Sequence, residues 1–305
     1  MLKPKPHICR PFAGQPHGGI LFTNGYYHGL SGYLSPRIRF QLYNNIEPNG
    51  VVGNETLTML HTKELVTEAI DETSDLSEQY EETNYQQLIH KYFLPKDQYV
   101  NTKVKNNYIV LHHTAGTNNP YHTIDYWAKD SRGRIATEFV IGGQNYATGE
   151  DKYDGTIVQA FPHGYLAWHI GRSGSGAMNK SSVGIELCSM GRLTDNKTYT
   201  GKVVHGSQIE QLPEMFKGVL KFHRYSDAQI EALKDLLMYV SERDDIDLRI
   251  GLQQWIKKYG PTKAFSYQED AYYGKTKGLL SHGNIRRDKD DVYPDPRLVD
   301  MILTL

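Results

Sequence analysis

The sequence predicts an α/β fold for the part of the chain that follows residue 100, on three observations. An apolar run at residues 108–116 is too short for a helix and ends in a small-residue turn, which is typical of a buried strand. In residues 181–188, apolar side chains alternate with small or polar ones, which indicates a second strand. A capping box at Ser226–Gln229 then precedes apolar residues at helical spacing, namely Ile230, Leu233, Leu237 and Val240.

The same periodicities predict the other elements. In the N-terminal part, residues 57–70 place apolar side chains at roughly helical spacing, and we expect residues 85–92 to form another short helix. Farther along we expect a short helix at residues 121–129 and strands at residues 134–141 and 154–161. A helix should begin at Asp247 and end at residue 260, followed by a polar loop beside the site at residues 262–277 and a short closing helix at residues 298–303.

A boundary close to residue 100 divides the chain. Residues 1–50 are rich in Gly, Pro, Tyr and Asn and show no sustained period, so we interpret them as loops and short strands. Pro95 and the charged pair Lys96 and Asp97 mark the boundary. We therefore predict an N-terminal extension of uncertain fold and unknown role at residues 1–100, followed by a second domain at residues 101–305.

Composition excludes several classes of protein. With 305 residues and 39% hydrophobic residues, the chain can bury a large core. The 34 Lys and Arg balance 35 Asp and Glu, and no basic tract with interleaved aromatic residues predicts a nucleic-acid partner. No stretch is long enough to insert into a membrane, and prolines and glycines interrupt the first thirty residues where a signal peptide needs an apolar run. We expect synthesis in the cytoplasm, while the oligomeric state stays open.

Two histidines at the end of the first strand indicate where chemistry concentrates. Because side chains alternate across a strand, His112 shares a face with Tyr108 and Val110, while His113 faces the other way. For an isolated pair, a structural role in the core is the simpler interpretation. A further histidine, His282, precedes an acidic segment, however, and two histidines with a carboxylate are the ligands of an open zinc site.

Glu186 is the second unusual feature. It lies in the middle of an otherwise apolar strand, on the face opposite to Val183, Ile185 and Leu187. A carboxylate in such a place costs free energy unless it is paired, hydrated or functional.

Four segments resemble the zinc-dependent N-acetylmuramoyl-L-alanine amidases, the family that also holds peptidoglycan recognition proteins and many phage endolysins. The likeness covers roughly residues 104–305 and implies a mixed central β-sheet flanked by helices. The segments occur in the family's order and approximate spacing, and they are residues 109–116, residues 167–171, Asn179 with residues 182–187, and His282 with residues 289–291.

The resemblance implies a role for each matching residue. His112 and His282 would be zinc ligands, with Asp291 as the third, because it follows Lys289 at the family's Lys-x-Asp spacing. Asp295 is the alternative third ligand. His113 would be structural or would orient a neighbour.

The implied reaction is hydrolysis of the amide bond between N-acetylmuramic acid and L-alanine in bacterial peptidoglycan. Glu186 would act as general base, and Lys289 would stabilise the oxyanion of the tetrahedral intermediate. A position that carries a catalytic tyrosine in some relatives aligns with Thr137, which favours the glutamate-dependent variant. We interpret the neighbouring Glu138 as a surface carboxylate, with orientation of a ligand histidine as the alternative.

The substrate would be bound by His169, Trp168, Asn179 and Thr114. The alternatives are a hydrogen-bonded loop histidine for the first, packing beneath the site for Trp168, and ordinary loop capping for Asn179 and Thr114.

The whole pattern predicts a phage endolysin that is made in the cytoplasm of an infected bacterium and acts on the cell wall. One alternative is a non-catalytic module that binds muropeptides. Another is a virion-associated wall-binding component in which residues 1–100 are the docking part.

Overall fold

The computed structural model describes residues 88–305. The helix predicted at residues 57–70 and the loops predicted for residues 1–50 lie outside the described residues, as does the first part of the helix predicted at 85–92. Among the described residues, no helix is both long and apolar enough to cross a membrane.

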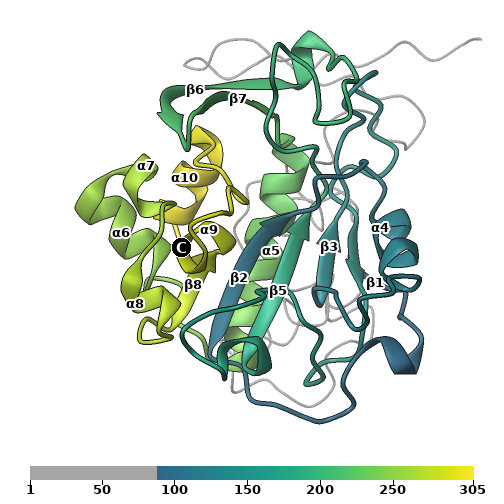
Figure 1. Ribbon diagram of the computed structural model, residues 1–305, viewed down its shortest axis with the longest axis vertical. Coiled ribbons are helices and arrows are strands. Elements are labelled where there is room, and N and C mark those ends of the chain that lie inside the picture. The colour runs from purple at the N-terminus through teal and green to yellow at the C-terminus, as the bar shows by residue number, and fades with distance from the viewer. Residues whose placement is uncertain (1–87) are drawn as a thin grey trace, which may run out of the picture. The chain divides into compact units, whose positions relative to one another are not determined.

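A six-stranded mixed sheet forms the centre of the described unit (Figure 1), which confirms the predicted fold class. Four strands run parallel to one another, and β1 and β4 run in the opposite direction. In spatial order the strands are β1 (Ile89–Lys91), β4 (Ile157–Gln159), β3 (Phe139–Ile141), β5 (Ser182–Leu187), β2 (Tyr108–His113) and β8 (Gly278–Ser281).

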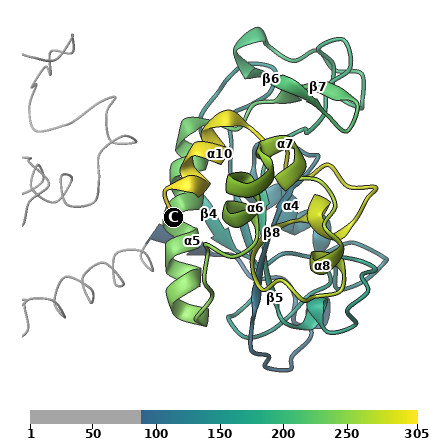
Figure 2. The same cartoon turned by 90° about the vertical axis from the view of Figure 1, so that its left-hand side faces the viewer.

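One face of this sheet packs on the longest helix, α5 (Asp227–Asp244), with α10 (Pro296–Leu303) beside it (Figure 2). Odd-numbered strand residues such as Leu111 and Ile185 join the helix residues Leu233 and Leu237 in one buried apolar cluster. The opposite face of β3 and β4 is covered by α4 (Pro120–Trp127). These helices leave the opposite face of β2 and β5 free for a site.

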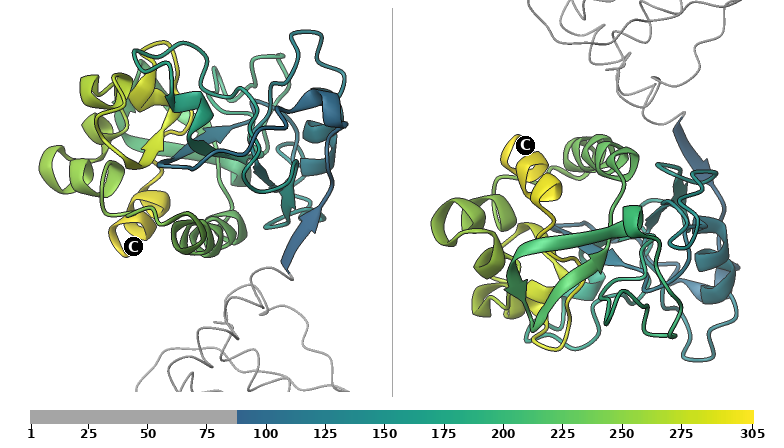
Figure 3. Two further views of the ribbon diagram at one scale, coloured as in Figure 1. Left: turned by 90° about the horizontal axis from the view of Figure 1, so that it is seen from below. Right: turned by 90° about the horizontal axis from the view of Figure 1, so that it is seen from above.

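The remaining elements lie on the β8 side of the sheet and beyond the carboxyl ends of its parallel strands. The hairpin of β6 (Ile209–Phe216) and β7 (Val219–His223) forms a separate two-stranded sheet beyond the ends of β2 and β5 (Figures 1 and 3). The other helices follow this hairpin or α5 in the chain. They are α6 (Leu252–Tyr259), α7 (Pro261–Ala264), α8 (Glu269–Tyr272) and α9 (His282–Ile285), and short 3-10 turns occur at Lys96–Gln98, Met178–Lys180 and Gly206–Gln208.

The prediction of a helix at residues 85–92 is wrong, because Ile89–Lys91 forms strand β1. Parallel pairing with β4 supplies the backbone hydrogen bonds of this segment, and the pairing continues as Leu94 N–H donates to Ala160 O at 2.8 Å. A partner about seventy residues away outweighs the weak local preference for a helix. The sheet therefore includes a strand that precedes the domain boundary expected near residue 100.

Three further boundaries differ from the prediction. The helix expected from Asp247 begins at Leu252, because Gly251 has a φ of 92° and packs so closely on Leu279 O that a Cβ would collide there. The polar segment 262–277 contains part of α7 and all of α8 instead of one long loop. The strand predicted at 134–141 is regular only from Phe139 to Ile141.

Candidate metal centre and active site

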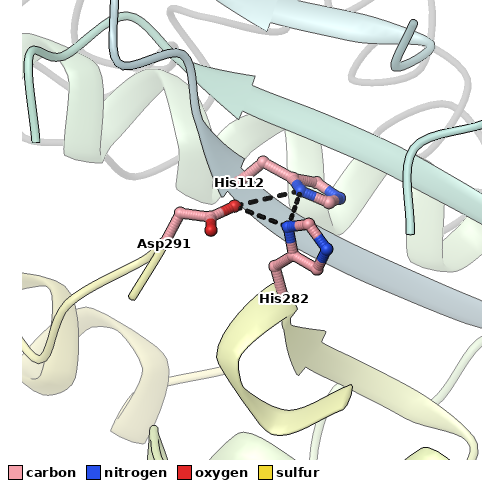
Figure 4. Close-up of side chains that lie close together, drawn as sticks. All are labelled: His112, His282 and Asp291. Carbon is pink, nitrogen blue, oxygen red and sulfur yellow. Dashed lines mark hydrogen bonds and ion pairs between the residues drawn. The ribbon is translucent and has the colours of Figure 1, made fainter. Parts of the chain in front are cut away.

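Three buried side chains converge at the carboxyl end of strand β2 (Figure 4). His112 Nδ1 lies 3.0 Å from His282 Nδ1 and 3.2 Å from Asp291 Oδ2, and His282 Nδ1 lies 2.8 Å from the same oxygen. Strands β2 and β8 are parallel neighbours in which Leu111 pairs with Ser281. The residue that follows Leu111 is His112, and the residue that follows Ser281 is His282. The sheet register thus brings together ligands that are 170 residues apart.

The hydrogen bonds and burial of the triad indicate which ring nitrogens can bind a cation. His282 Nε2 lies 3.0 Å from Ile170 O, which can only accept, so Nε2–H donates there and Nδ1 is the nitrogen that faces His112 and Asp291. Burial lowers the pKa of His112 to about 4, so its ring is neutral near pH 7. Burial alone would raise the pKa of Asp291, but the two histidines hold it well below its usual value.

The three atoms that face one another, two imidazole nitrogens and a carboxylate oxygen, all donate an electron pair to a metal ion once the protons among them are released. Two imidazoles and a carboxylate are a common protein ligand set of catalytic zinc, and bonds of about 2.0–2.1 Å give tetrahedral ligand separations of roughly 3.3 Å. The observed separations are close to that value, so the residues present fit a zinc ion.

Glu186 lies directly beside His112, its partner in the pairing of β5 with β2. Its buried Oε2 has no hydrogen-bond partner among residues 88–305. Burial raises the pKa of Glu186 well above its usual value, the Asp291 charge raises it further, and Lys289 lowers it. A cation held by the triad would act in the same direction as Lys289. The group is therefore a carboxyl whose affinity for a proton depends on the charge beside it.

The segment that carries Lys289 and Asp291 is held from outside by one residue of the β6–β7 hairpin and by Arg192, which precedes the hairpin in the chain. Lys217, at the tip between β6 and β7, donates a hydrogen bond to Lys289 O. Arg192 forms an ion pair of 2.6 Å with Asp290. No signal in the sequence pointed to Lys217 or Arg192, because their partners lie far along the chain.

Asn179 and Thr114, two of the predicted substrate-binding residues, make contacts that match loop capping. Asn179 Oδ1 accepts from the backbone N–H groups of His169 and Ile170 at 3.2 and 2.9 Å, and its Nδ2 donates to Gly171 O at 2.8 Å. Thr114 Oγ1 accepts from the N–H of Gly116 at 3.1 Å and also contacts the Ser189 backbone. Contact of either side chain with substrate stays a prediction.

Trp168 and His169 differ in their surroundings. Trp168 exposes 38% of its surface, which leaves its ring available to a ligand. His169 is half-buried, and its two ring nitrogens lie 2.9 Å from His112 Nε2 and 2.9 Å from Ser182 Oγ. The structure therefore places His169 directly behind a member of the triad.

His113 and Asp295 lie away from the triad. His113 points to the other side of β2, where its Nδ1 lies 2.9 Å from Tyr225 Oη. Asp295 is fully buried and caps α10 by accepting from Arg297 N–H at 2.9 Å. Of the two aspartates considered as a third ligand, the triad contains Asp291.

The interpretation of Glu138 as a surface carboxylate is wrong. Its side chain is 3% exposed and forms an ion pair of 2.8 Å with Arg243 of helix α5. Gln159 donates a further hydrogen bond of 2.9 Å to the same carboxylate. Glu138 thus links the sheet to the helix beneath it.

Comparison with known proteins identifies a family for the chain. A family model described as N-acetylmuramoyl-L-alanine amidase matches residues 101–291. No curated protein sequence matches the chain.

Several solved structures are similar to parts of the chain. A selenomethionine derivative of AmpD is 17% identical, with 70% of this chain and 94% of that one covered and a TM-score of 0.38. AmiD from E. coli is 23% identical over 49% of this chain and 48% of that one, with a TM-score of 0.32. A mutant endolysin from Bacillus subtilis is 20% identical over 52% and 79%, with a TM-score of 0.33.

The family model covers more than half of the chain, including the three members of the triad and Glu186. The chain therefore belongs to the N-acetylmuramoyl-L-alanine amidase family and is an enzyme that hydrolyses an amide bond of peptidoglycan.

Proposed function

We propose that the chain is a zinc-dependent amidase that cleaves between N-acetylmuramic acid and L-alanine, with His112, His282 and Asp291 as zinc ligands. The observation that carries the proposal is the meeting of two imidazoles, of which His112 is held neutral by burial, and the carboxylate of Asp291 beside the unpaired carboxyl of Glu186. A zinc ion bound there would supply a Lewis acid and a water molecule whose pKa is lowered to about 7.

In this proposal, Glu186 and Lys289 move and stabilise charge during the reaction. Glu186 takes a proton from the attacking water and passes it to the departing amine of L-alanine, so that the amide C–N bond breaks without releasing an anion. Its proton affinity, raised by burial and lowered by neighbouring positive charge, suits a group that must both accept and return a proton. The ammonium group of Lys289 stabilises the negative charge that develops on the carbonyl oxygen.

Substrate binding is the next part of the proposal. The exposed ring of Trp168 would stack on a sugar or on the stem peptide of peptidoglycan. Thr114 and Asn179 would shape the neighbouring loops, and any direct contact with substrate would come from backbone groups that they position. The proposal assigns no nucleic-acid partner.

The biological setting of the proposal is a phage endolysin, made in the cytoplasm of an infected bacterium and acting on the cell wall. The resemblance of the motifs around His112, His169 and Glu186 to the amidase family, which holds many phage endolysins, supports this setting. Residues 1–100 would form an N-terminal extension attached to the catalytic domain at 101–305.

Digestion of purified peptidoglycan tests the reaction. The full chain should release new N-terminal L-alanine without new reducing sugar ends, and Glu186→Gln should keep its zinc but lose this release. Glu242→Gln is a matched control, because Glu242 is exposed on α5. Binding to peptidoglycan without any release of L-alanine ends would favour the recognition-module alternative.

A further inference from the structure

We propose that His169 is a positioning residue that fixes the tautomer of His112, so that the lone pair of His112 Nδ1 points into the triad. It acts through a chain of hydrogen bonds from Met178 O through Ser182 and His169 to His112, in which the donor and the acceptor of each bond are fixed. The inference rests on the proposed zinc site and adds a residue that prepares a ligand for the metal.

The direction of the chain is set at its far end by a backbone carbonyl. Met178 O can only accept, so the Ser182 hydroxyl donates to it at 2.8 Å. The single hydroxyl proton of Ser182 is then used, and Ser182 Oγ can only accept from His169 Nε2, 2.9 Å away. His169 therefore carries its proton on Nε2.

The same logic continues through the second ring. With the proton on Nε2, His169 Nδ1 is an acceptor, and the atom 2.9 Å from it is His112 Nε2. His112 must then carry its own proton on Nε2 and a lone pair on Nδ1. That Nδ1 is the atom that lies 3.0 Å from His282 Nδ1 and 3.2 Å from Asp291 Oδ2.

Local packing holds His169 in this place. A Cβ on Gly184 of β5 would lie 2.9 Å from His169 Nδ1 and 2.7 Å from Thr137 Cγ2, so only glycine leaves room for the ring. Asn179 binds the backbone N–H groups of His169 and Ile170. Because Ile170 O accepts from His282 Nε2, one short loop sets the tautomers of both ligand histidines.

Both ring nitrogens of His169 are occupied in this arrangement, which separates the proposal from a role in direct substrate contact. Partners that orient ligand histidines typically contribute about 10–100-fold to metal affinity. The expected signature is therefore a change in zinc affinity and in the tautomer of His112, which can be measured without substrate.

A pair of similar side chains provides the test. The Oδ1 of asparagine occupies the position of a histidine Nδ1, so His169→Asn keeps an acceptor for His112. His169→Gln places its amide near the position of Nε2, so it keeps the contact with Ser182 and loses the one with His112. Zinc affinity of the full chain, measured by competition with a chromophoric chelator, should fall about 10–100-fold in His169→Gln and His169→Ala. It should stay within roughly threefold of wild type in His169→Asn, because the bond to the ligand is retained.

The nitrogen-15 NMR shifts of His112 provide a second readout on the metal-free protein. Wild type and His169→Asn should show the tautomer protonated at Nε2, while His169→Ala should show a mixture. His122→Ala is a control, because His122 is exposed. Ser182→Ala tests the chain without altering either ring, and it should shift the tautomer of His112 toward a mixture.

The outcomes separate this inference from the proposed function. Wild type that binds no zinc would overturn the zinc site, and the NMR measurement would still decide the tautomer of His112. Wild type that binds zinc, with His169→Ala binding equally well, would overturn the role of His169 alone. Equal losses in His169→Asn and His169→Gln would also overturn it, because they would show that the ring merely fills space.

Discussion

Glu186→Gln is expected to remove most of the amidase activity while making the stability of the metal-free protein less dependent on pH. The substitution keeps the size of the side chain and removes its ability to take a proton. General acid–base catalysis typically contributes about 10²–10⁴-fold, so the rate of release of L-alanine ends should fall by that factor. Zinc content should not change, because Glu186 lies outside the triad.

The effect on stability follows from the environment of the carboxyl group. Burial raises the pKa of Glu186 well above its usual value near 4.5, so the folded protein binds a proton that the unfolded chain releases. Between these two pKa values the wild type loses stability as pH rises, by about 1.4 kcal/mol per pH unit for one proton. Glutamine does not titrate, and this contribution to the slope disappears in the variant.

Urea unfolding of the metal-free proteins, followed between about pH 5 and pH 7, measures the difference. The free energies of unfolding of wild type and variant should diverge as pH rises, with the variant the more stable. Parallel curves would show that Glu186 is not held protonated by its surroundings. Undiminished hydrolysis by the variant would show that another group is the base.

Four other measurements test separate parts of the structure. Chelation should abolish hydrolysis and lower Tm, since metal binding adds to folding free energy, and added zinc should restore both. Asp291→Ala should lose zinc, and full zinc content in this variant would contradict the ligand set. Asp295→Ala should keep zinc but lose about 0.5–2 kcal/mol of stability, because its side chain caps α10. Arg243→Met should cost about 3–5 kcal/mol in urea unfolding with zinc content unchanged, because it leaves the buried Glu138 carboxylate without its ion pair. Burial lowers the pKa of His223 to about 4, so the folded metal-free protein loses stability as pH falls from about 6.5 to about 4. In urea unfolding, His223→Asn should reduce the slope of this loss by at most about 1.4 kcal/mol per pH unit, because asparagine does not titrate.

The face on which each strand residue lies could be predicted from alternation alone. Residues of one parity in β2 and β5 carry His112 and Glu186, and residues of the other parity enter the core against α5. Alternation does not predict which strands are neighbours, so the contact between His112 and His282 depended on the family resemblance. The structure shows that β2 and β8 are neighbours, with Leu111 paired with Ser281, and this pairing brings the two histidines together.

Side chains with distant partners could not be placed from the sequence. Glu138 immediately precedes a short strand, where a charged residue is usually exposed, and only the return of α5 past the sheet buries it against Arg243. His169 was predicted to bind substrate, and its motif does not show that Gly184 leaves a space beneath the ring. In both cases a residue more than ten positions away decides the environment.

Short elements were the weakest part of the prediction for a related reason. A three-residue strand such as β1 has almost no periodicity of its own, and its conformation comes from the hydrogen bonds that β4 offers. The β6–β7 hairpin was missed entirely, since its burial pattern does not alternate regularly and its pairing is interrupted by a register shift.

That hairpin gives the enzyme a means of adjustment that does not alter a reacting group. Lys217 of the hairpin, together with Arg192 ahead of it in the chain, holds the segment on which Lys289 and Asp291 lie, yet neither belongs to the triad. A change in the length or tip of the hairpin would shift the backbone on which an ammonium group and a ligand lie together. Natural variation or engineering could therefore retune turnover through a surface arm and leave every residue of the chemistry in place.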